Sequence, residues 1–369
     1  MLTVSAQNSF VLTMAATAAN KNGEKMANKV KKIFLMLGPE CNLQCKYCLQ
    51  HDMVDHDTSM VKPEVKEWLQ EQVPTDFEKP FRIIFYGGEP LVYWNAIKDV
   101  VESVKGNVSY AMISNGKLMT PDKVDFINDY NVCATISWDG ANVEKTRGYD
   151  VVKNNPCILD IKRLGFSAVL SSYTYPLDFL NEIDPILLEY KRIHGVSPNL
   201  NIDTIMDFGN CGELRKMDCH KITEQMKFII KHKKEKTAYY RIVDQLQKKY
   251  VFYREYVDKR AVCGNGYTIW NVDVNGDLYR CHNCGEKVGT IFDEPADVLA
   301  RVKELDPTYE HYQEKCSTCP AQPLCRSGCP LIDSKGREEY FCDIRKAYLS
   351  PIIEDINTPK ETGRIIHIG

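Results

Sequence analysis

CNLQCKYC, at residues 41–48, places three cysteines close together, directly after the apolar run KKIFLML of residues 31–37. A disulfide joins two cysteines and a structural zinc site usually takes four ligands, so three thiols need another explanation. A four-iron, four-sulfur cluster has four irons, each of which requires an outside ligand. Three cysteines leave one iron open for a small molecule, just as catalytic zinc sites keep one open position. The stretch therefore predicts a cluster-binding loop that follows a strand.

Around this loop, strand-like and helix-like runs alternate as far as about residue 210. Apolar strands joined by helices indicate a parallel sheet with helical crossovers. The expected strands are residues 31–37, 81–86, 107–114, 131–138, 167–175 and 200–208, and the clearest helices are 63–73, 94–105 and 121–130. Six such units predict an α/β fold built on a partial (β/α)6 TIM-like barrel that does not close.

Unusual polar or glycine-bearing loops follow four of these strands. They are CNLQC at 41–45, GGEP at 87–90, SNG at 114–116 and SWDG at 137–140. Function in parallel sheets gathers at the carboxyl ends of the strands. Any one of these loops alone would be a weak signal, but four on one rim predict a single functional site.

The composition of the chain limits its possible partners and location. The chain has 369 residues and a net charge of −3, which gives no reason to expect a nucleic-acid or anionic-membrane partner. No apolar run reaches membrane-spanning length. The apolar stretch at residues 9–20 has no Lys or Arg before it, so we expect a cytoplasmic protein without a signal peptide. Fifteen cysteines, mostly in two short-spaced groups, indicate metal or iron–sulfur ligands instead of a disulfide framework.

At this point the chain resembles the radical S-adenosylmethionine (SAM) superfamily, whose motif C-x3-C-x2-C is here Cys41, Cys45 and Cys48. In that family the open iron is chelated by the amino and carboxylate groups of SAM. An electron from the reduced cluster then cleaves a C–S bond of SAM, and the resulting 5′-deoxyadenosyl radical abstracts a hydrogen atom. A zinc site is the alternative, and it would be colourless and free of iron.

The other rim loops match the same family residue by residue. The resemblance implies an aromatic near adenine, a glycine-rich loop at the SAM amino group, further loops on the SAM side, and an arginine for the SAM carboxylate. A guanidinium fork suits a carboxylate, although the interval from Asp139 to Arg147 is a residue or two shorter than is usual in the family. The residues concerned are Tyr47, Gly87, Gly88, Glu89, Ser114, Asn115, Ser137, Asp139 and Arg147.

A second cysteine pattern, CSTCPAQPLCRSGC, stands at residues 316–329. Together with Cys263, Gly276 and Cys281 upstream and Cys342 downstream, it resembles the SPASM domain, which holds two auxiliary four-iron clusters. The resemblance implies Cys263, Cys281 and Cys329 for the first cluster, with Cys284 as the candidate fourth ligand. For the second cluster it implies Cys316, Cys319, Cys325 and Cys342. Two zinc ribbons are the alternative reading of this segment.

The chain divides into five expected segments, with a charged helix or helix pair between the barrel and the cysteine-rich region. We expect this connector to be solvated and the region after it to have little periodicity, so that metal clusters order it. The segments are a weakly ordered N-terminus (1–30), the partial barrel (31–215), the helical connector (216–260), a small SPASM auxiliary-cluster domain (261–350) and a C-terminal tail (351–369).

The resemblance implies a radical SAM oxidoreductase that modifies or crosslinks a side chain of a ribosomally made peptide, using three 4Fe-4S clusters. Its partners would be a peptide or protein substrate and an electron donor such as flavodoxin or ferredoxin. The leader would be bound either by a separate protein or by surfaces of the barrel and the SPASM domain. Sulfatase maturases, the first alternative, place an aspartate base where this chain has His282. An imidazole can take a proton near neutral pH, so His282 is a candidate catalytic base, with packing as the competing role. A non-catalytic iron–sulfur electron-transfer or sensor protein is the second alternative.

Overall fold

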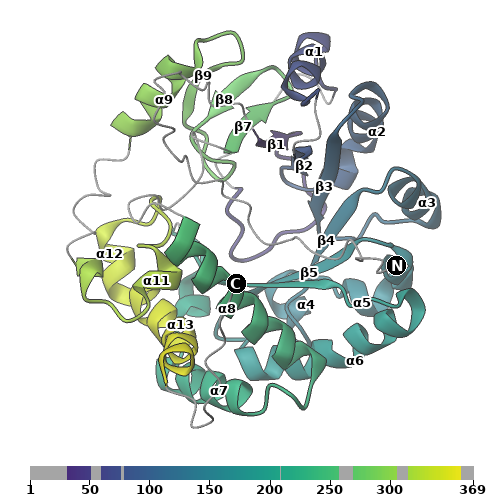
Figure 1. Cartoon of the computed structure of the whole chain (residues 1–369). Helices are drawn as coiled ribbons and strands as arrows, with labels where there is room; N and C mark the ends of the chain where they lie inside the picture. The colour runs from purple at the N-terminus through teal and green to yellow at the C-terminus, as the bar shows by residue number, and fades with distance from the viewer. Residues whose placement is uncertain are drawn as a thin grey trace, which may run out of the picture.

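The structure is a computed structural model that describes residues 31–50, 60–75, 79–207, 209–256, 269–305 and 315–358. Its centre is one sheet in the order β6-β5-β4-β3-β2-β1-β7-β8-β9. The first six strands run parallel and follow the chain order: β1 (Lys32–Met36), β2 (Phe81–Tyr86), β3 (Val108–Ser114), β4 (Cys133–Ser137), β5 (Leu164–Leu170) and β6 (Asn199–Thr204). The predicted open α/β barrel of six strands is confirmed (Figure 1).

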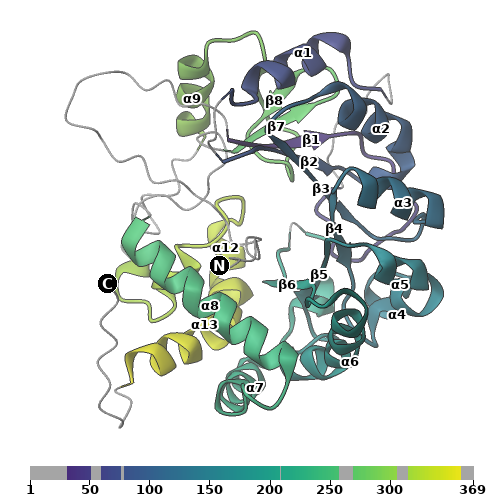
Figure 2. The same ribbon diagram turned by 45° about the vertical axis from the view of Figure 1, so that its right-hand side comes forward.

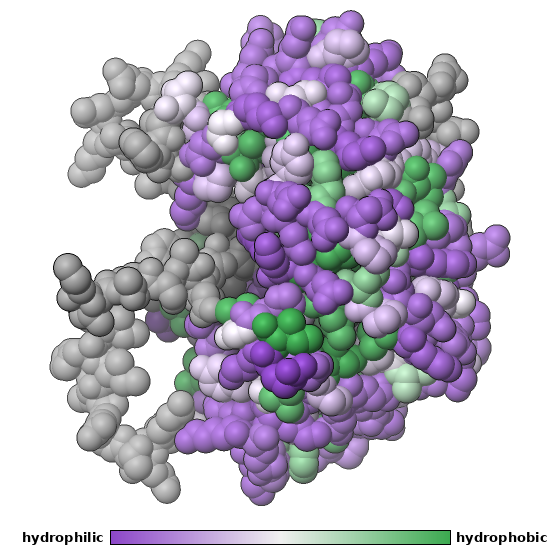
Figure 3. All heavy atoms as spheres, turned by 90° about the vertical axis from the view of Figure 1, so that its right-hand side faces the viewer, coloured by the Kyte–Doolittle hydropathy of each residue, from purple (hydrophilic) through white to green (hydrophobic). Residues whose placement is uncertain are grey.

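Helices cover the outer face of this sheet. They are α1 (Pro63–Gln72), α2 (Trp94–Ser103), α3 (Pro121–Asp129), the short α4 (Val143–Thr146) and α5 (Val151–Asn154), and α6 (Pro176–His194). Alternate strand residues such as Leu35 and Ile83 face these helices and are fully buried. The other strand residues face inward, where Phe34, Ile84 and Ala111 belong to a separate apolar cluster. The helices turn a mainly hydrophilic face to the outside (Figure 3).

The sheet continues beyond the six predicted strands. β7 (Ile269–Asp273) pairs parallel with β1, and β8 (Asp277–Tyr279) and β9 (Lys287–Thr290) follow it antiparallel. These strands lie in the region whose sequence shows little periodicity, and they were not predicted. Asn275 and Gly276 form the β7–β8 turn, where Gly276 has φ +91°. Helix α9 (Pro295–Glu304) then packs on β9.

The opposite end of the sheet is covered by helices. α7 (Cys219–Lys231) and α8 (Thr237–Tyr256) form the predicted helix pair, and α8 lies against β6 and α6. The pair is not simply solvated, because α8 buries Tyr239, Ile242 and Val243. α11 (Gln322–Cys325), α12 (Ser334–Gly336) and α13 (Cys342–Asn357) gather beside α7 and α8, away from β7–β9 (Figures 1 and 2). Among the described residues, no helix is long and apolar enough to cross a membrane.

Candidate functional site

The three cysteines of residues 41–48 lie at the carboxyl end of β1, at the edge of a cavity of about 1230 Å³ that fills the barrel. Backbone hydrogen bonds fix the loop: Cys48 N donates to Cys45 O at 3.1 Å, and Lys46 N donates to Thr146 O at 3.0 Å. The side chain of Asn210 donates to Cys48 O at 2.9 Å. All three cysteines line the cavity, so their sulfurs face one shared space.

Burial raises the pKa of two of these thiols, Cys41 and Cys45. Burial raises the pKa of Cys45 to about 11, and the charges of Cys48 and Cys41 add to the rise while Arg147 opposes it. Within the described ranges, no three His, Cys, Asp or Glu side chains are close enough to hold a single metal ion. A four-iron cluster does not require the three sulfurs to meet at one metal ion, because each thiolate binds a different iron. Three cysteines around one space are the ligand set that such a cluster with one open iron requires.

The GGEP loop after β2 lies directly against the base of the cysteine loop. Gly88 N donates to Gly38 O, and Glu89 N donates to Glu40 O, each at 2.9 Å. A Cβ on Gly88 would overlap the carbonyl oxygens of Pro39 and Glu40, and Gly87 has φ +144°. Glycine is required here because two backbones meet without room for a side chain.

Glu89 is 1% exposed and holds two rim loops together. One carboxylate oxygen accepts from Leu91 N at 2.9 Å and from Ser114 Oγ at 2.7 Å, and the other accepts from Asn115 N at 2.7 Å. Burial raises the pKa of Glu89, and these three donors oppose the rise. The predicted SAM-side loops therefore meet at a buried carboxylate.

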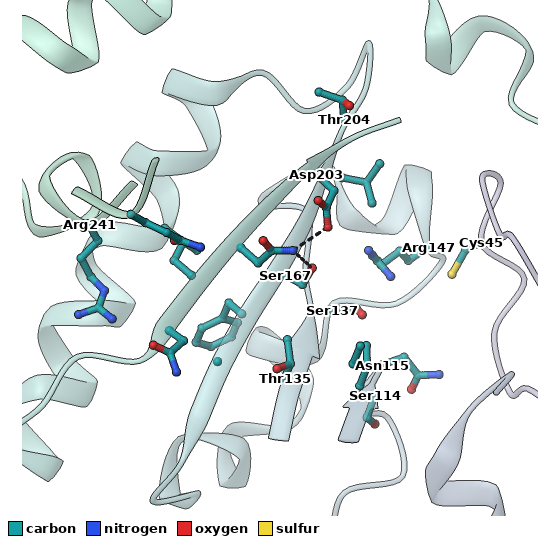
Figure 4. Close-up of a pocket in the computed structure, with 18 of the residues that line it drawn as sticks. Cys45, Ser114, Asn115, Thr135, Ser137, Arg147, Ser167, Asp203, Thr204 and Arg241 are labelled. Carbon is teal, nitrogen blue, oxygen red and sulfur yellow. Dashed lines mark hydrogen bonds between the residues drawn. The ribbon is translucent and has the colours of Figure 1, made fainter. Parts of the chain in front are cut away.

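Asn115 connects the SNG loop to the cysteine loop. Its side-chain amide donates to Asn42 Oδ1 at 2.9 Å and points at Cys41 Sγ, 3.9 Å away. Ser137, the next predicted residue, lines the cavity between Asn115 and Arg147 (Figure 4). Sequence reasoning missed Asn42, because an asparagine inside a cysteine motif has no distinctive pattern.

Asp139 lies on the loop after β4 and is held by hydrogen bonds from several residues. It is 1% exposed and accepts hydrogen bonds from Tyr47 Oη, Thr146 Oγ1 at 2.8 Å and Val169 N at 3.0 Å. Arg147 donates to it through Nε at 3.0 Å and Nη2 at 3.2 Å. Asp139 is thus a positioning residue, which fixes two other predicted residues in the cavity wall.

Arg147 is the group that this arrangement presents to the cavity. Burial opposes its charge, but Asp139 outweighs burial and holds the pKa of the guanidinium above its ordinary value. Its guanidinium lies 5.2 Å from the centre of the Tyr47 ring. Among the described residues, nothing accepts a hydrogen bond from its Nη1, and Figure 4 shows it beside Cys45. A carboxylate-binding fork next to the cysteine loop suits the carboxylate of SAM.

Part of the chain matches a known protein family. Residues 35–187 match the model of the radical SAM superfamily. This stretch is a radical SAM domain. The chain is an enzyme with such a domain, which sets aside the non-catalytic alternative. The family binds a 4Fe-4S cluster and SAM.

Two relatives and two solved structures show how far the similarity extends. The chain is 28% identical to the radical SAM cyclopropyl synthase TigE of Paramaledivibacter caminithermalis over 51% of this chain and 45% of that protein, less than half of its length. It is 23% identical to a cysteine-type anaerobic sulfatase-maturating enzyme of Clostridium novyi over 90% of this chain and 98% of that enzyme. The fold resembles anSMEcpe with bound AdoMet (TM-score 0.61, 17% identity, 88% and 98% covered) and Streptococcus suis SuiB bound to precursor peptide SuiA (TM-score 0.55, 13% identity, 83% and 76% covered).

The pairing of β7 with β1 brings the segment of residues 281–284, which follows β8, to the end of the loop at residues 41–50. Gln50 Nε2 donates to His282 O at 3.0 Å and to Asn283 Oδ1 at 2.7 Å, and Tyr86 Oη donates to the same oxygen at 2.9 Å. A hydrogen bond with Cys281 lowers the pKa of Cys284 to about 7. Gln50, Tyr86 and Asn283 were missed because they meet only through the β1–β7 pairing.

His282 lines the cavity but is held by aromatic packing. Its ring stacks on Phe34 with centroids 3.9 Å apart, and Tyr86 meets it edge-on at 4.7 Å. Nδ1 lies 3.3 Å from Asn271 Oδ1. Burial and the charge of Lys32 lower the pKa of His282 to about 3, so the ring is neutral near pH 7 and a weak base.

The remaining predicted cluster cysteines lie in two places. Cys263 falls outside the described residues, and Cys281 and Cys284 follow β8. Cys316 and Cys319 precede α11, and Cys325, Cys329 and Cys342 lie between the end of α11 and the start of α13. Burial raises the pKa of Cys342, and the charges of Cys325 and Cys316 add to the rise. Two partly buried cations, Lys249 and Arg345, face Cys325 and each other. Asp203 lies near both cations and favours their charged forms, and a thiolate-ligated cluster would add to this negative charge.

The far wall of the cavity was not predicted at all. It consists of polar side chains from β4 to β6 and of charged side chains from α8 and the turn before it. Figure 4 shows Arg241 on one side and Cys45 on the other, with Thr135, Ser167 and Asp203 between them. The basic face of α8 reads as ordinary solvated surface in the sequence, and only the packing of α8 against β6 turns it inward.

Proposed function

We propose that this radical SAM enzyme is a maturase that oxidatively modifies a side chain of a ribosomally made peptide and forms a thioether or carbon–carbon crosslink. One relative and one fold neighbour support the peptide part: a sulfatase-maturating enzyme and a SuiB structure that holds a precursor peptide. The observation that carries the proposal is the single cavity of about 1230 Å³, which has the cysteine loop at one end and a polar wall at the other. Its size suits a cofactor and a peptide segment together.

At the cysteine end, each residue has a distinct task. Cys41, Cys45 and Cys48 would ligate the cluster, and the backbone of Gly87 and Gly88 would approach the SAM amino group. Arg147 would bind the SAM carboxylate, with Asp139 fixing its direction. When bound, the cluster and SAM supply a reducing electron and a hydrogen-abstracting group. Tyr47 and the buried Glu89 keep the surrounding loops in place.

The remaining predicted cluster cysteines would hold two auxiliary clusters. Cys263, Cys281 and Cys329, with Cys284 as a fourth ligand, would hold one auxiliary cluster. Cys316, Cys319, Cys325 and Cys342 would hold a second, beside Lys249 and Arg345. A nearby electron acceptor favours crosslinking, because a carbon radical must lose an electron to form a new bond without reduction. The reducing electron would come from a flavodoxin or ferredoxin, and a separate protein would bind the leader of the precursor.

A formylglycine-generating sulfatase maturase is the second candidate, since the sulfatase-maturating relative aligns over 98% of its length. His282 disfavours it, because its ring stacks on Phe34 and meets the edge of Tyr86 at the position where those maturases place an aspartate base. We propose that His282 packs against Phe34 and Tyr86 instead of moving a proton.

The test uses anaerobically reconstituted protein with SAM and dithionite. Mass spectrometry of a precursor peptide encoded near the gene should show the loss of two hydrogen atoms, together with 5′-deoxyadenosine. An aldehyde on a cysteine-containing sulfatase peptide would instead establish the second candidate. An unchanged SAM pool in the presence of a complete cluster would refute both.

A further inference from the structure

The outer end of the cavity is built from the last strand of the barrel and the helix that covers it. Along β6, Leu200, Ile202 and Thr204 are buried, and the alternating residues Asn201 and Asp203 face the cavity. Asn201 donates to Asp203 at 2.6 Å and lies 3.5 Å from Ser167 Oγ (Figure 4). Together with Thr135, these groups give this wall of the cavity several hydrogen-bonding side chains, between the apolar residues Phe166 and Leu200 that also line it.

Opposite this wall, the cavity is lined mainly by cations. Six Lys and Arg side chains face three acids at this end, although the whole chain carries a net charge of −3. The cations are Lys191, Lys233, Lys234, Lys236, Arg241 and Lys248. Two of them are paired with acids, Lys233 with Asp355 and Lys248 with Asp244. The excess positive charge therefore belongs to the remaining four.

Arg241 stands out among these four. It is half-buried on α8, and among the described residues its guanidinium makes no hydrogen bond and no ion pair. Burial lowers its pKa even though the charge of Asp244 opposes this. A partly desolvated guanidinium without a partner is unfavourable unless something else supplies an anion. A carboxylate is the anion whose geometry matches its fork of N–H groups.

We propose that this end of the cavity selects acidic peptides, with a substrate carboxylate bound by Arg241 and further acidic groups near Lys191, Lys234 and Lys236. The hydrogen-bonding wall of β5 and β6 would take the peptide backbone, and the residue to be modified would point toward Cys45 and Arg147. This inference rests on the proposed peptide substrate. It adds a charge requirement that family membership does not supply.

The test measures peptide binding by the full-length reconstituted protein with SAM present, by isothermal titration calorimetry. The probes are three short peptides, capped at both ends, that carry glutamate, glutamine or lysine around a central cysteine. The glutamate peptide should bind about tenfold or more tightly than the glutamine peptide at low salt, and the preference should shrink at high salt. Equal binding of the glutamate and glutamine peptides would overturn the inference.

Variants assign the preference to Arg241. Arg241→Gln should weaken binding of the glutamate peptide by about tenfold and leave binding of the glutamine peptide nearly unchanged. The matched control is Arg192→Gln, an exposed arginine of α6 that pairs with Glu189 and does not line the cavity. Arg241→Glu should make the protein prefer the lysine peptide, a gain that loss of folding cannot produce. If Arg241→Gln and Arg192→Gln bind the glutamate peptide equally, the assignment is wrong.

Failure of this inference can be told apart from failure of the proposed function. Formation of 5′-deoxyadenosine from SAM by the wild-type protein is measured without any peptide. If it occurs while the three peptides bind alike, only the charge requirement falls. If it does not occur, the proposed radical chemistry falls, whatever the peptides do.

Discussion

The two ends of the cavity differ in how their buried charged side chains are paired. At the cysteine end, buried carboxylates are saturated with donors: Asp139 accepts from Tyr47, Thr146, Arg147 and Val169, and Glu89 accepts from three groups. At the α8 end, Arg241 has no partner among the described residues. A fixed network suits a cofactor that is always the same, and unpaired cations suit a ligand that arrives and leaves. The difference indicates which end binds which molecule.

The largest expected effect separates the two ends directly. Cys45→Ala should abolish 5′-deoxyadenosine formation, because one of three cluster ligands is lost, and iron content should fall by about four per chain. Binding of the glutamate peptide should change by less than about threefold, since Arg241 lies at the other end. Cys157→Ala, at a cysteine outside the cavity, is the control and should keep both properties. Full 5′-deoxyadenosine formation by Cys45→Ala would break the comparison.

The second-largest effect is expected at Asp139, whose carboxylate accepts hydrogen bonds from four residues. Asp139→Asn leaves the Arg147 charge buried without its partner, which should lower the free energy of unfolding by about 3–5 kcal/mol. Anaerobic denaturant titration measures the loss. Glu189→Gln removes an exposed ion pair with Arg192 and should cost less than about 1 kcal/mol. Equal stability of the two variants would mean that Asp139 does not hold the site together.

A smaller effect is expected at Glu89. In Glu89→Gln, an amide group faces backbone N–H donors, so at least one buried hydrogen bond is lost at a cost of about 1–3 kcal/mol. The loops that carry Ser114 and Asn115 should shift, and SAM affinity measured by calorimetry should fall about tenfold. Glu102→Gln, on the exposed side of α2, should leave SAM affinity as it is. Unchanged affinity in Glu89→Gln would show that the rim loops do not depend on this carboxylate.

The smallest effect is expected at His282. If His282 only packs, His282→Phe should keep the stacking on Phe34 and change product formation by less than about threefold. His282→Gln should lose the ring contact, worth about 0.5–1.5 kcal/mol of stability, with similar activity. Activity is measured as peptide product per 5′-deoxyadenosine. A collapse of this ratio in His282→Phe would restore the catalytic base as the better role.

The sequence predicted the cysteine end well and the α8 end poorly, for a physical reason. Cys41, Cys45 and Cys48, the GGEP loop and Arg147 follow strands whose apolar runs are clear, so their shared rim could be inferred from local patterns. Asp139 was placed on the correct loop, but its position behind Arg147 depends on contacts with Tyr47 and Val169. Such contacts have no signature in a linear pattern.

The missed regions all depend on long-range packing. WNVDVNGDLY, residues 270–279, contained an Asn-Gly turn between short apolar segments, which is a hairpin signal, but its pairing with β1 joins residues far apart in the chain. The cationic face of α8 resembled solvated surface until its packing on β6 turned it toward the cavity. Amphipathic helices show which residues are apolar, but not which cavity their polar face will line.

The central claim is that three cysteines hold a cluster with one open iron at which SAM binds. Electron paramagnetic resonance of the dithionite-reduced protein, recorded with and without SAM, tests it most directly. The account predicts that SAM shifts the spectrum of one cluster in the wild-type protein and that this SAM-sensitive signal is missing in Cys45→Ala. A spectrum that SAM leaves unchanged, or an identical shift in Cys45→Ala, would contradict it.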